Sequence, residues 1–136
     1  MVISSKGRYA LRMMLDLAQH CGDGFVSLKH ISERQEVSLK YLEAITASLN
    51  RAGLVLSQRG KEGGYRLSRP ASEITVAEVL HSAEGSLAAV SCLELEQSGC
   101  ERAEQCKTLP LWRHLDTLMD NYLSGVSLQD VMEGNV

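Results

Sequence analysis

Three of the four cysteines of this 136-residue chain lie in one polar segment, SCLELEQSGCERAEQC, at residues 91–106. Cysteines that only fill a core usually stand among apolar residues, whereas Cys92, Cys100 and Cys106 have glutamate, glutamine and glycine around them. Thiolates grouped in this way can hold a metal ion or an iron–sulfur cluster, or take part in thiol–disulfide exchange. The segment is therefore the first candidate for a functional site.

The rest of the composition indicates the setting of these thiols. No apolar run approaches the roughly 20 residues that cross a bilayer, and charges interrupt the apolar positions of the N-terminus, MVISSKGRYALRMMLDLAQ, unlike in a signal peptide. We expect a cytoplasmic protein without membrane contact. In that compartment cysteines act as thiols or metal ligands more often than as disulfides. The length suits one domain with its own core and an appended element.

The net charge of −3 conceals two halves of opposite sign. Residues 1–70 contain 11 Lys and Arg against 6 Asp and Glu, a balance of +5, whereas residues 71–136 contain 3 against 11, a balance of −8. A nucleic-acid surface needs only a local basic face, so the acidic total does not exclude DNA binding. The N-terminal half is predicted to meet the anionic partner.

The basic half has the pattern of a helix-turn-helix. Apolar residues at helical spacing predict a first helix from about Lys6, which CGDG ends. A short helix then begins after Ser27 in SLKHISERQ, and another begins after Ser38, both serines being good N-caps. The stripe Leu39, Leu42, Ile45 and Leu49 is predicted to face the core. Two short helices joined across EVS are typical of a DNA-binding helix-turn-helix.

A β-hairpin is predicted directly after these helices. Residues 55–58 and 65–69 are short strands around RGKEGG, whose glycines permit a close backbone approach. A hairpin in this position is a wing, with Arg59 and Lys61 at its tip. A further short helix follows, capped at Thr75.

The C-terminal region is predicted to hold a long helix that packs against a copy of itself. Its apolar residues step by 3, 4, 3 and 4, which is a heptad seam. The predicted dimer interface consists of Trp112, Leu115, Met119, Tyr122 and Val126. The expected fold is therefore mainly α with a small β-hairpin wing, a winged helix-turn-helix followed by a long dimerisation helix. The divisions are 1–70 for DNA binding, 71–90 for a connecting helix, 91–107 for the cysteine segment and 108–136 for dimerisation.

The motifs KGRYAL, SLKYLE and RG-x-x-GGY, with ITVAEVL and LPLW…VSLQDVM in the same order, resemble the Rrf-two family of bacterial winged-helix regulators, the IscR, NsrR and CymR type. The resemblance covers nearly the whole chain. It implies a homodimer that pairs through the long C-terminal helix. It also implies binding to near-palindromic double-stranded operator DNA, with one winged helix-turn-helix on each half-site.

Residue chemistry supports DNA contact independently, because the N-terminal residues of a helix in the major groove reach base edges. Lys40 can bond a phosphate or a guanine, whereas Glu43 can accept from cytosine and repels phosphate. Arg59 suits a narrow minor groove, and Tyr41 either contacts DNA or packs on the wing. The residues predicted to contact DNA are Lys6, Arg8, Ser38, Lys40, Tyr41, Glu43, Arg51, Arg59, Gly60 and Lys61.

The resemblance also implies an iron–sulfur cluster, [2Fe–2S] or [4Fe–4S], on Cys92, Cys100 and Cys106. Five residues separate the last two cysteines, as is usual in the family, but seven separate the first two, which puts the cluster type in doubt. IscR-like members have a histidine three residues after the last cysteine, where this chain has Leu109. Some relatives use a carboxylate from the first helix of the partner subunit, where this chain has Arg8. The fourth ligand stays open among His81, His114, Cys21, Glu94, Glu96, Glu101 and Glu104.

Other interpretations of the thiols and of the chain stay open. Zinc favours paired cysteines and four closed ligands, and a thiol switch needs an electropositive setting, which the four glutamates of the segment oppose. A cluster-free regulator of the same family would respond to a small molecule or, like CymR-type members, to an enzyme of cysteine synthesis. A winged-helix module that binds protein is the alternative outside DNA binding. No catalytic constellation is visible, so no enzyme is predicted.

Overall fold

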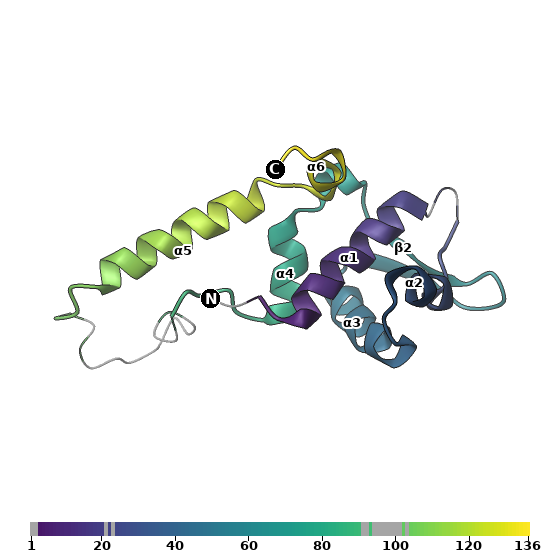
Figure 1. The fold of residues 1–136 in the computed structure, drawn as a ribbon, viewed down its shortest axis with the longest axis horizontal. Helices are drawn as coiled ribbons and strands as arrows, with labels where there is room; N and C mark the ends of the chain where they lie inside the picture. The colour runs from purple at the N-terminus through teal and green to yellow at the C-terminus, as the bar shows by residue number, and fades with distance from the viewer. Residues whose placement is uncertain (1–2, 21, 23, 91–92, 94–101, 103) are drawn as a thin grey trace.

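The computed structural model describes residues 3–20, 22, 24–90, 93, 102 and 104–136. Cys21, Cys92, Cys100 and the acidic candidates Glu94, Glu96 and Glu101 lie outside these residues. The elements are α1 (Ser5–His20), α2 (Leu28–Gln35), α3 (Leu39–Arg51), β1 (Val55–Gln58), β2 (Gly64–Leu67), the 3-10 helix η1 (Ala71–Glu73), α4 (Val76–Glu84), α5 (Leu109–Ser124) and α6 (Leu128–Glu133). The described part is mainly helical with one hairpin, as predicted. Helices α1 to α4 pack together, and α5 extends away from them (Figure 1). No helix among the described residues is both long and apolar enough to span a membrane.

Local capping explains where the helices of the motif begin. The Ser27 hydroxyl accepts a hydrogen bond from the His30 amide, and the Ser38 hydroxyl accepts one from the Tyr41 amide. Each bond satisfies an amide that has no partner inside its helix. Between α2 and α3, Glu36 turns the chain in the left-handed region at φ +54°. The predicted caps at Ser27 and Ser38 are confirmed.

The larger of two apolar clusters among the described residues joins α1 to the rest of the fold. Its fully buried side chains include Met13, Met14, Leu17, Ile31, Leu42, Ile45, Leu49, Ile74 and Leu128. Leu128 belongs to α6, so the end of the chain packs into the same core as the helix-turn-helix. The prediction that Leu39 is buried is wrong, because it opens α3 at the edge of this core and is 45% exposed.

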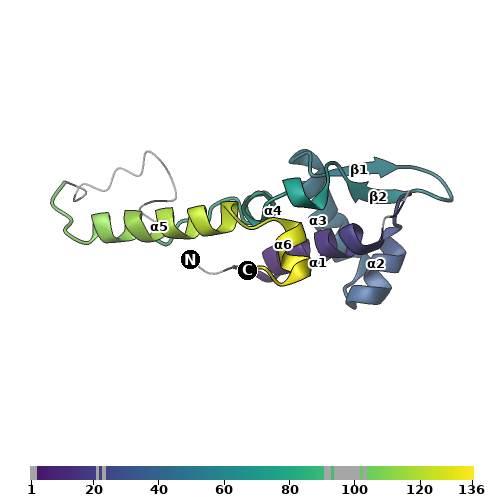
Figure 2. The ribbon, with the colours of Figure 1, turned by 90° about the horizontal axis from the view of Figure 1, so that it is seen from above.

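The hairpin is an antiparallel pair with Val55 opposite Leu67 and Gln58 opposite Gly64. It is tied to the segment before α2 by two backbone hydrogen bonds of 2.8 Å between Val26 and Tyr65. Gly64 lies against this junction, and a Cβ there would overlap the Val26 carbonyl. The hairpin projects from the end of the molecule opposite α5 (Figure 2).

The end of α5 differs from the predicted seam. The helix stops at Ser124, and Val126 lies beyond it with 8% exposure, packed among Val76 and Leu80. The Val126 carbonyl accepts a 2.8 Å bond from the Val76 amide. Val126 is thus used inside its own chain, and the placement of this residue on the outward seam is wrong. The short turn at Gly125 redirects the chain back to α4.

Candidate nucleic-acid interface

The first turns of α3 present polar side chains to solvent. Ser38, Lys40 and Glu43 are exposed, as the prediction for a groove-facing surface requires. Tyr41 is half-buried, and its ring meets the ring of Tyr9 edge-on, with centroids 5.8 Å apart and planes at 87°. Tyr41 therefore packs on Tyr9 of α1, a contact that the sequence did not indicate.

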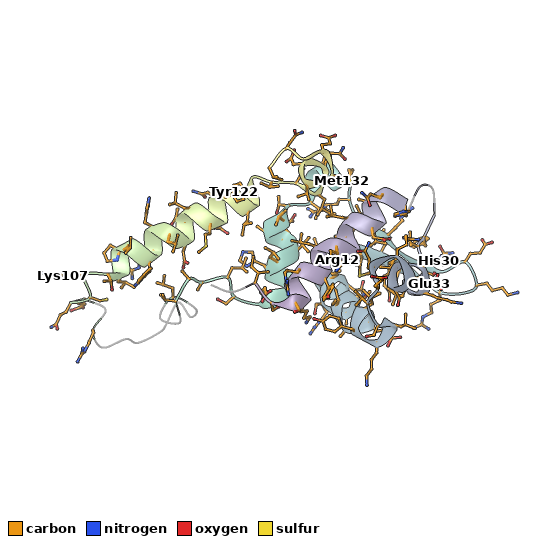
Figure 3. All side chains as sticks on the ribbon, in the orientation of Figure 1. Arg12, His30, Glu33, Lys107, Tyr122 and Met132 are labelled. Atoms are coloured by element: carbon orange, nitrogen blue, oxygen red, sulfur yellow. The ribbon has the colours of Figure 1, made fainter. Side chains whose placement is uncertain are left out.

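Tyr9 is in turn held by the end of α2. The Arg12 guanidinium lies 4.9 Å from the centre of the Tyr9 ring. It also donates to the Gln35 side-chain oxygen at 3.0 Å and to the Gln35 carbonyl at 2.7 Å. Figure 3 labels Arg12 among the crowded side chains between α1 and the motif. These contacts hold the Tyr9 ring, on which Tyr41 of α3 packs, close to the end of α2 that precedes the turn into α3.

A buried carboxylate at the other end of α1 fixes α2. The Asp16 side chain has no exposed surface and accepts from Arg34 at 2.6 and 2.9 Å and from Gln35 at 2.9 Å. Burial alone would raise the pKa of Asp16, but the hydrogen bonds from Arg34 and Gln35 and the charge of Arg34 outweigh it and hold the pKa below its usual value. The sequence analysis missed Asp16. An acidic residue among the apolar positions of a predicted helix is the pattern that could have indicated its buried ion pair.

Basic residues from α1 and α3 converge on one hydroxyl. Lys6 Nζ donates to Ser48 Oγ at 3.0 Å, and an Arg51 Nη donates to the same oxygen at 3.4 Å. Arg8 is exposed and donates to the Ser5 hydroxyl. We call Lys6, Arg51 and Ser48 the Ser48 cluster. Two cations on one neutral acceptor retain donors for an anion such as a phosphate.

The wing tip is exposed at Arg59, Gly60 and Lys61. Gly60 has φ +108° and its carbonyl accepts from the Gly63 amide at 3.0 Å, which closes the turn. A Cβ at Gly63 would overlap the Gln58 backbone. The close approaches at Gly63 and Gly64 are thus internal, whereas Gly60 at the tip is surrounded by open space.

Along α5 the structure separates two apolar faces. One is outward and exposed: Leu111 (58%), Leu115 (37%), Leu118 (53%) and Tyr122 (57%). We call these four residues the outer seam. Trp112 and Met119, from the predicted interface, are half-buried on the adjacent face. The predicted residues Leu115 and Tyr122 belong to the outer seam, and Figure 3 shows Tyr122 on the extended helix.

Cys106, the one of the three predicted cysteine ligands that the structure describes, is half-buried just before α5. Its sulfur lies 3.2 Å from the Thr108 hydroxyl. Bonds from the Thr108 hydroxyl and amide and from the Leu109 amide lower the pKa of Cys106 and favour its thiolate. Amides at the start of α5 thus favour the thiolate although the neighbouring glutamates oppose it. The sequence analysis missed the part that Thr108 plays in lowering this pKa.

The structure also places three candidates for a fourth ligand, His81, His114 and Glu104, and Glu104 is exposed just before Cys106. His81 Nε2 lies 3.6 Å from an Asp120 carboxylate oxygen, in a pocket of about 270 Å³ that Leu93 also lines. Asp120 is on the second half of α5, and a helix rises about 1.5 Å per residue, so roughly 16 Å separates it from Leu109 beside Cys106. His81 is therefore remote from Cys106 of the same chain. His114 is exposed on α5.

Residues 3–134 match the family Rrf2, the Rrf-two family above, described as "Iron-dependent Transcriptional regulator". The chain is similar to the HTH-type transcriptional regulator IscR of Photorhabdus laumondii, with 46% identity over 132 residues, 97% of this chain and 79% of that protein. The IscR of Aliivibrio salmonicida is 44% identical over 135 residues, 99% and 79% of the two chains. These relatives are named as transcriptional regulators and not as enzymes.

Two solved structures share the fold. CymR (YrzC), the global cysteine regulator of B. subtilis, has a TM-score of 0.77 and 35% identity, covering 96% of this chain and 95% of that one. The IscR of T. potens has a TM-score of 0.77 and 36% identity, covering 100% and 89%. Two of the three regulator types that the sequence motifs resemble, IscR and CymR, are thus among the structural neighbours.

Proposed function

This chain belongs to the Rrf2 family of transcriptional regulators, and from that membership we propose that it is a cytoplasmic homodimer that binds near-palindromic operator DNA. One winged helix-turn-helix contacts each half-site, and an iron–sulfur cluster on the cysteine segment senses iron, redox state or nitric oxide. The observations that support the DNA part are the exposed polar start of α3 and the Ser48 cluster at the other end of the same helix. A helix with this surface enters the major groove while flanking cations bind phosphates.

The outer seam supports the dimer. Leu111, Leu115, Leu118 and Tyr122 are separated by four, three and four positions, a spacing that is the same in both directions along the helix. Two antiparallel α5 helices about a two-fold axis at the centre of the seam bring Leu111 against the partner's Tyr122 and Leu115 against the partner's Leu118. Such a pairing covers side chains that a single chain leaves in water.

The surroundings of the Cys106 sulfur suit a ligand of an iron–sulfur cluster. Its sulfur is half-buried, favoured as the thiolate and held at a helix start, which is the form that binds iron. Cys92, Cys100 and Cys106 would hold the cluster, which supplies reversible redox and ligand-exchange chemistry when bound. The protein's own contribution is to orient Cys106 through Thr108 and to join the segment to α4 and α5.

DNA binding is tested first by selecting 30-base-pair duplexes from a random pool and measuring affinity by fluorescence anisotropy over a salt series. We expect affinity to fall steeply with salt, since several phosphates are contacted. Arg59→Ala should weaken binding about tenfold, whereas Lys107→Ala, at the far end of the α5 arm (Figure 3), should not change it. Absence of salt-dependent binding would favour the protein-interaction module instead.

The cluster is tested by anaerobic purification with an absorption spectrum and iron and sulfide analysis. We expect a coloured protein with matched iron and sulfide, which Cys100→Ala abolishes. Loss of the colour in Cys21→Ala would identify Cys21 as the fourth ligand. A colourless protein after anaerobic reconstitution would favour the cluster-free regulator, for which the similarity to CymR is the supporting observation. Small-molecule effectors and partner enzymes would then be sought.

A further inference from the structure

The last residue of α4 binds the first residues of the described chain. One Glu84 carboxylate oxygen accepts from the Ser4 amide at 2.7 Å and from the Ser4 hydroxyl at 2.8 Å. Eighty positions separate these residues in the sequence. The contact is therefore a tertiary link between the end of α4 and the start of α1.

The same hydroxyl caps α1, so the link acts on the helix backbone. Ser4 Oγ accepts from the Gly7 amide at 3.2 Å while it donates to Glu84. Gly7 is buried directly beneath the carboxylate, and a Cβ there would overlap the Glu84 oxygen. Glycine at this position is thus what lets the carboxylate reach Ser4.

The link lies between two functional regions. On one side Lys6, adjacent to Gly7, donates to Ser48 of α3. On the other side Glu84 is followed by Gly85 at φ +78° and then by the chain that leads to the cysteine segment. Hydrogen bonds therefore connect the end of α4 to Ser4, and the first turn of α1 to the Ser48 cluster.

We propose that Glu84 is a positioning residue for DNA binding, holding the first turn of α1, and with it Lys6 and Arg8, in the orientation that contacts phosphate. This inference rests on the proposed DNA binding and adds the route by which α4 acts on it. Glu84 touches no nucleotide in this scheme; it acts through Ser4.

The sign of the effect distinguishes positioning from simple charge. A carboxylate close to a phosphate surface repels DNA, so its removal would tighten binding if charge alone mattered. Loss of a positioning contact has the opposite sign, because Lys6 and Arg8 then lose their fixed orientation. Glu84→Gln keeps the accepting oxygen and removes the charge, whereas Glu84→Ala removes both.

The experiment measures affinity of the full chain for the selected 30-base-pair duplex by anisotropy. We expect Glu84→Ala and Gly7→Ala each to weaken binding about five- to tenfold, and Glu84→Gln to remain within about twofold of the wild type. Gly7→Ala tests the same link from its other side, since the added methyl displaces the carboxylate. Glu73→Ala, which removes an exposed negative charge on η1, is the matched control and should not weaken binding.

Hydrogen exchange at the amides of Gly7 and Arg8 provides a readout without DNA. Exchange should be faster in Glu84→Ala than in the wild type and unchanged in Glu84→Gln. Equal or tighter DNA binding by Glu84→Ala, while the wild type binds normally, would overturn the inference and leave the proposed function standing. If the wild type binds no duplex, the proposed function fails, and unchanged exchange in Glu84→Ala would then overturn the link as well.

Discussion

The N-terminal unit (α1 to α4 with the hairpin) and the α5 arm solve the burial of their apolar side chains in different ways. In the N-terminal unit Met13, Ile31 and Ile45 have no exposed surface, and the buried Asp16 carboxylate finds its partners within the same chain. On α5 the leucines of the outer seam remain 37 to 58% exposed. The N-terminal unit thus buries its apolar side chains within its own chain, whereas α5 leaves a row of them exposed.

This difference indicates what each region needs in order to work. Groove and phosphate contacts require side chains held rigidly from behind, and the hydrogen bonds of Asp16 and Arg12 supply that support within the chain. Exposed apolar rows are unfavourable in water and mark an interaction surface. We expect changes to the first region to lower folding stability and changes to the second to alter assembly.

The largest expected effect is on assembly. Leu118→Asp places a charge in the centre of the outer seam, where burial in a dimer leaves it without a partner, and should weaken dimerisation at least about 100-fold. Sedimentation equilibrium measures the change. Thr117→Asp, which adds the same charge on a different face of α5, should remain dimeric. A dimeric Leu118→Asp would show that the chains pair elsewhere.

Removal of Arg34 should cost stability rather than assembly. Arg34→Met leaves the fully buried Asp16 carboxylate with Gln35 as its remaining side-chain donor, and we expect a loss of about 3 kcal/mol in the free energy of unfolding. Urea denaturation at pH 7 measures it. Arg113→Met, on the exposed part of α5, should change stability by less than about 0.5 kcal/mol.

The same carboxylate should make stability depend on pH. Because the folded pKa of Asp16 lies below its unfolded value, its contribution is full above about pH 4 and is lost as the pH falls through the folded pKa. The wild type should lose more stability between pH 6 and pH 3 than Asp16→Asn does. Equal slopes for the two proteins would mean that the Asp16 pKa is not lowered by folding.

A smaller effect is expected at the base of the α5 arm. Thr108→Val removes the hydroxyl that favours the Cys106 thiolate, so the pKa of Cys106 should rise and alkylation by iodoacetamide at pH 7 should slow roughly two- to fivefold. The rates are measured with the other three cysteines replaced by serine. Thr117→Val, whose hydroxyl bonds to the Arg113 carbonyl instead, is the control.

The smallest predicted change concerns the turn of the motif. Glu36 has φ +54°, a conformation that costs an L-residue more than glycine, so Glu36→Gly should stabilise the protein by about 1 kcal/mol. Glu33→Gly, inside the exposed face of α2, should destabilise it by a similar amount. Thermal unfolding compares the two variants. Destabilisation by Glu36→Gly would contradict the left-handed conformation of Glu36 in this turn.

Features that depend on neighbours in sequence could be predicted. The caps at Ser27, Ser38 and Thr75 are confirmed because a hydroxyl meets amides two or three residues ahead whatever the rest of the chain does. The hairpin is also where the sequence placed it, the long C-terminal helix is present but ends before Val126, and the motif order agrees with the family. The DNA contacts, the dimer interface and the cluster ligands remain predictions.

Features that depend on distant segments could not. Val126 continued the heptad spacing, but the turn at Gly125 directs it to α4, so its burial follows from where a helix ends. Asp16 with Arg34 and Glu84 with Ser4 are pairs whose partners meet only after the helices pack. Local sequence determined the helices, the hairpin and the grouping of three cysteines, because each of these depends on residues close together in the chain. Packing decided which charges are paired and which apolar row stays in water, because these depend on what lies opposite each side chain.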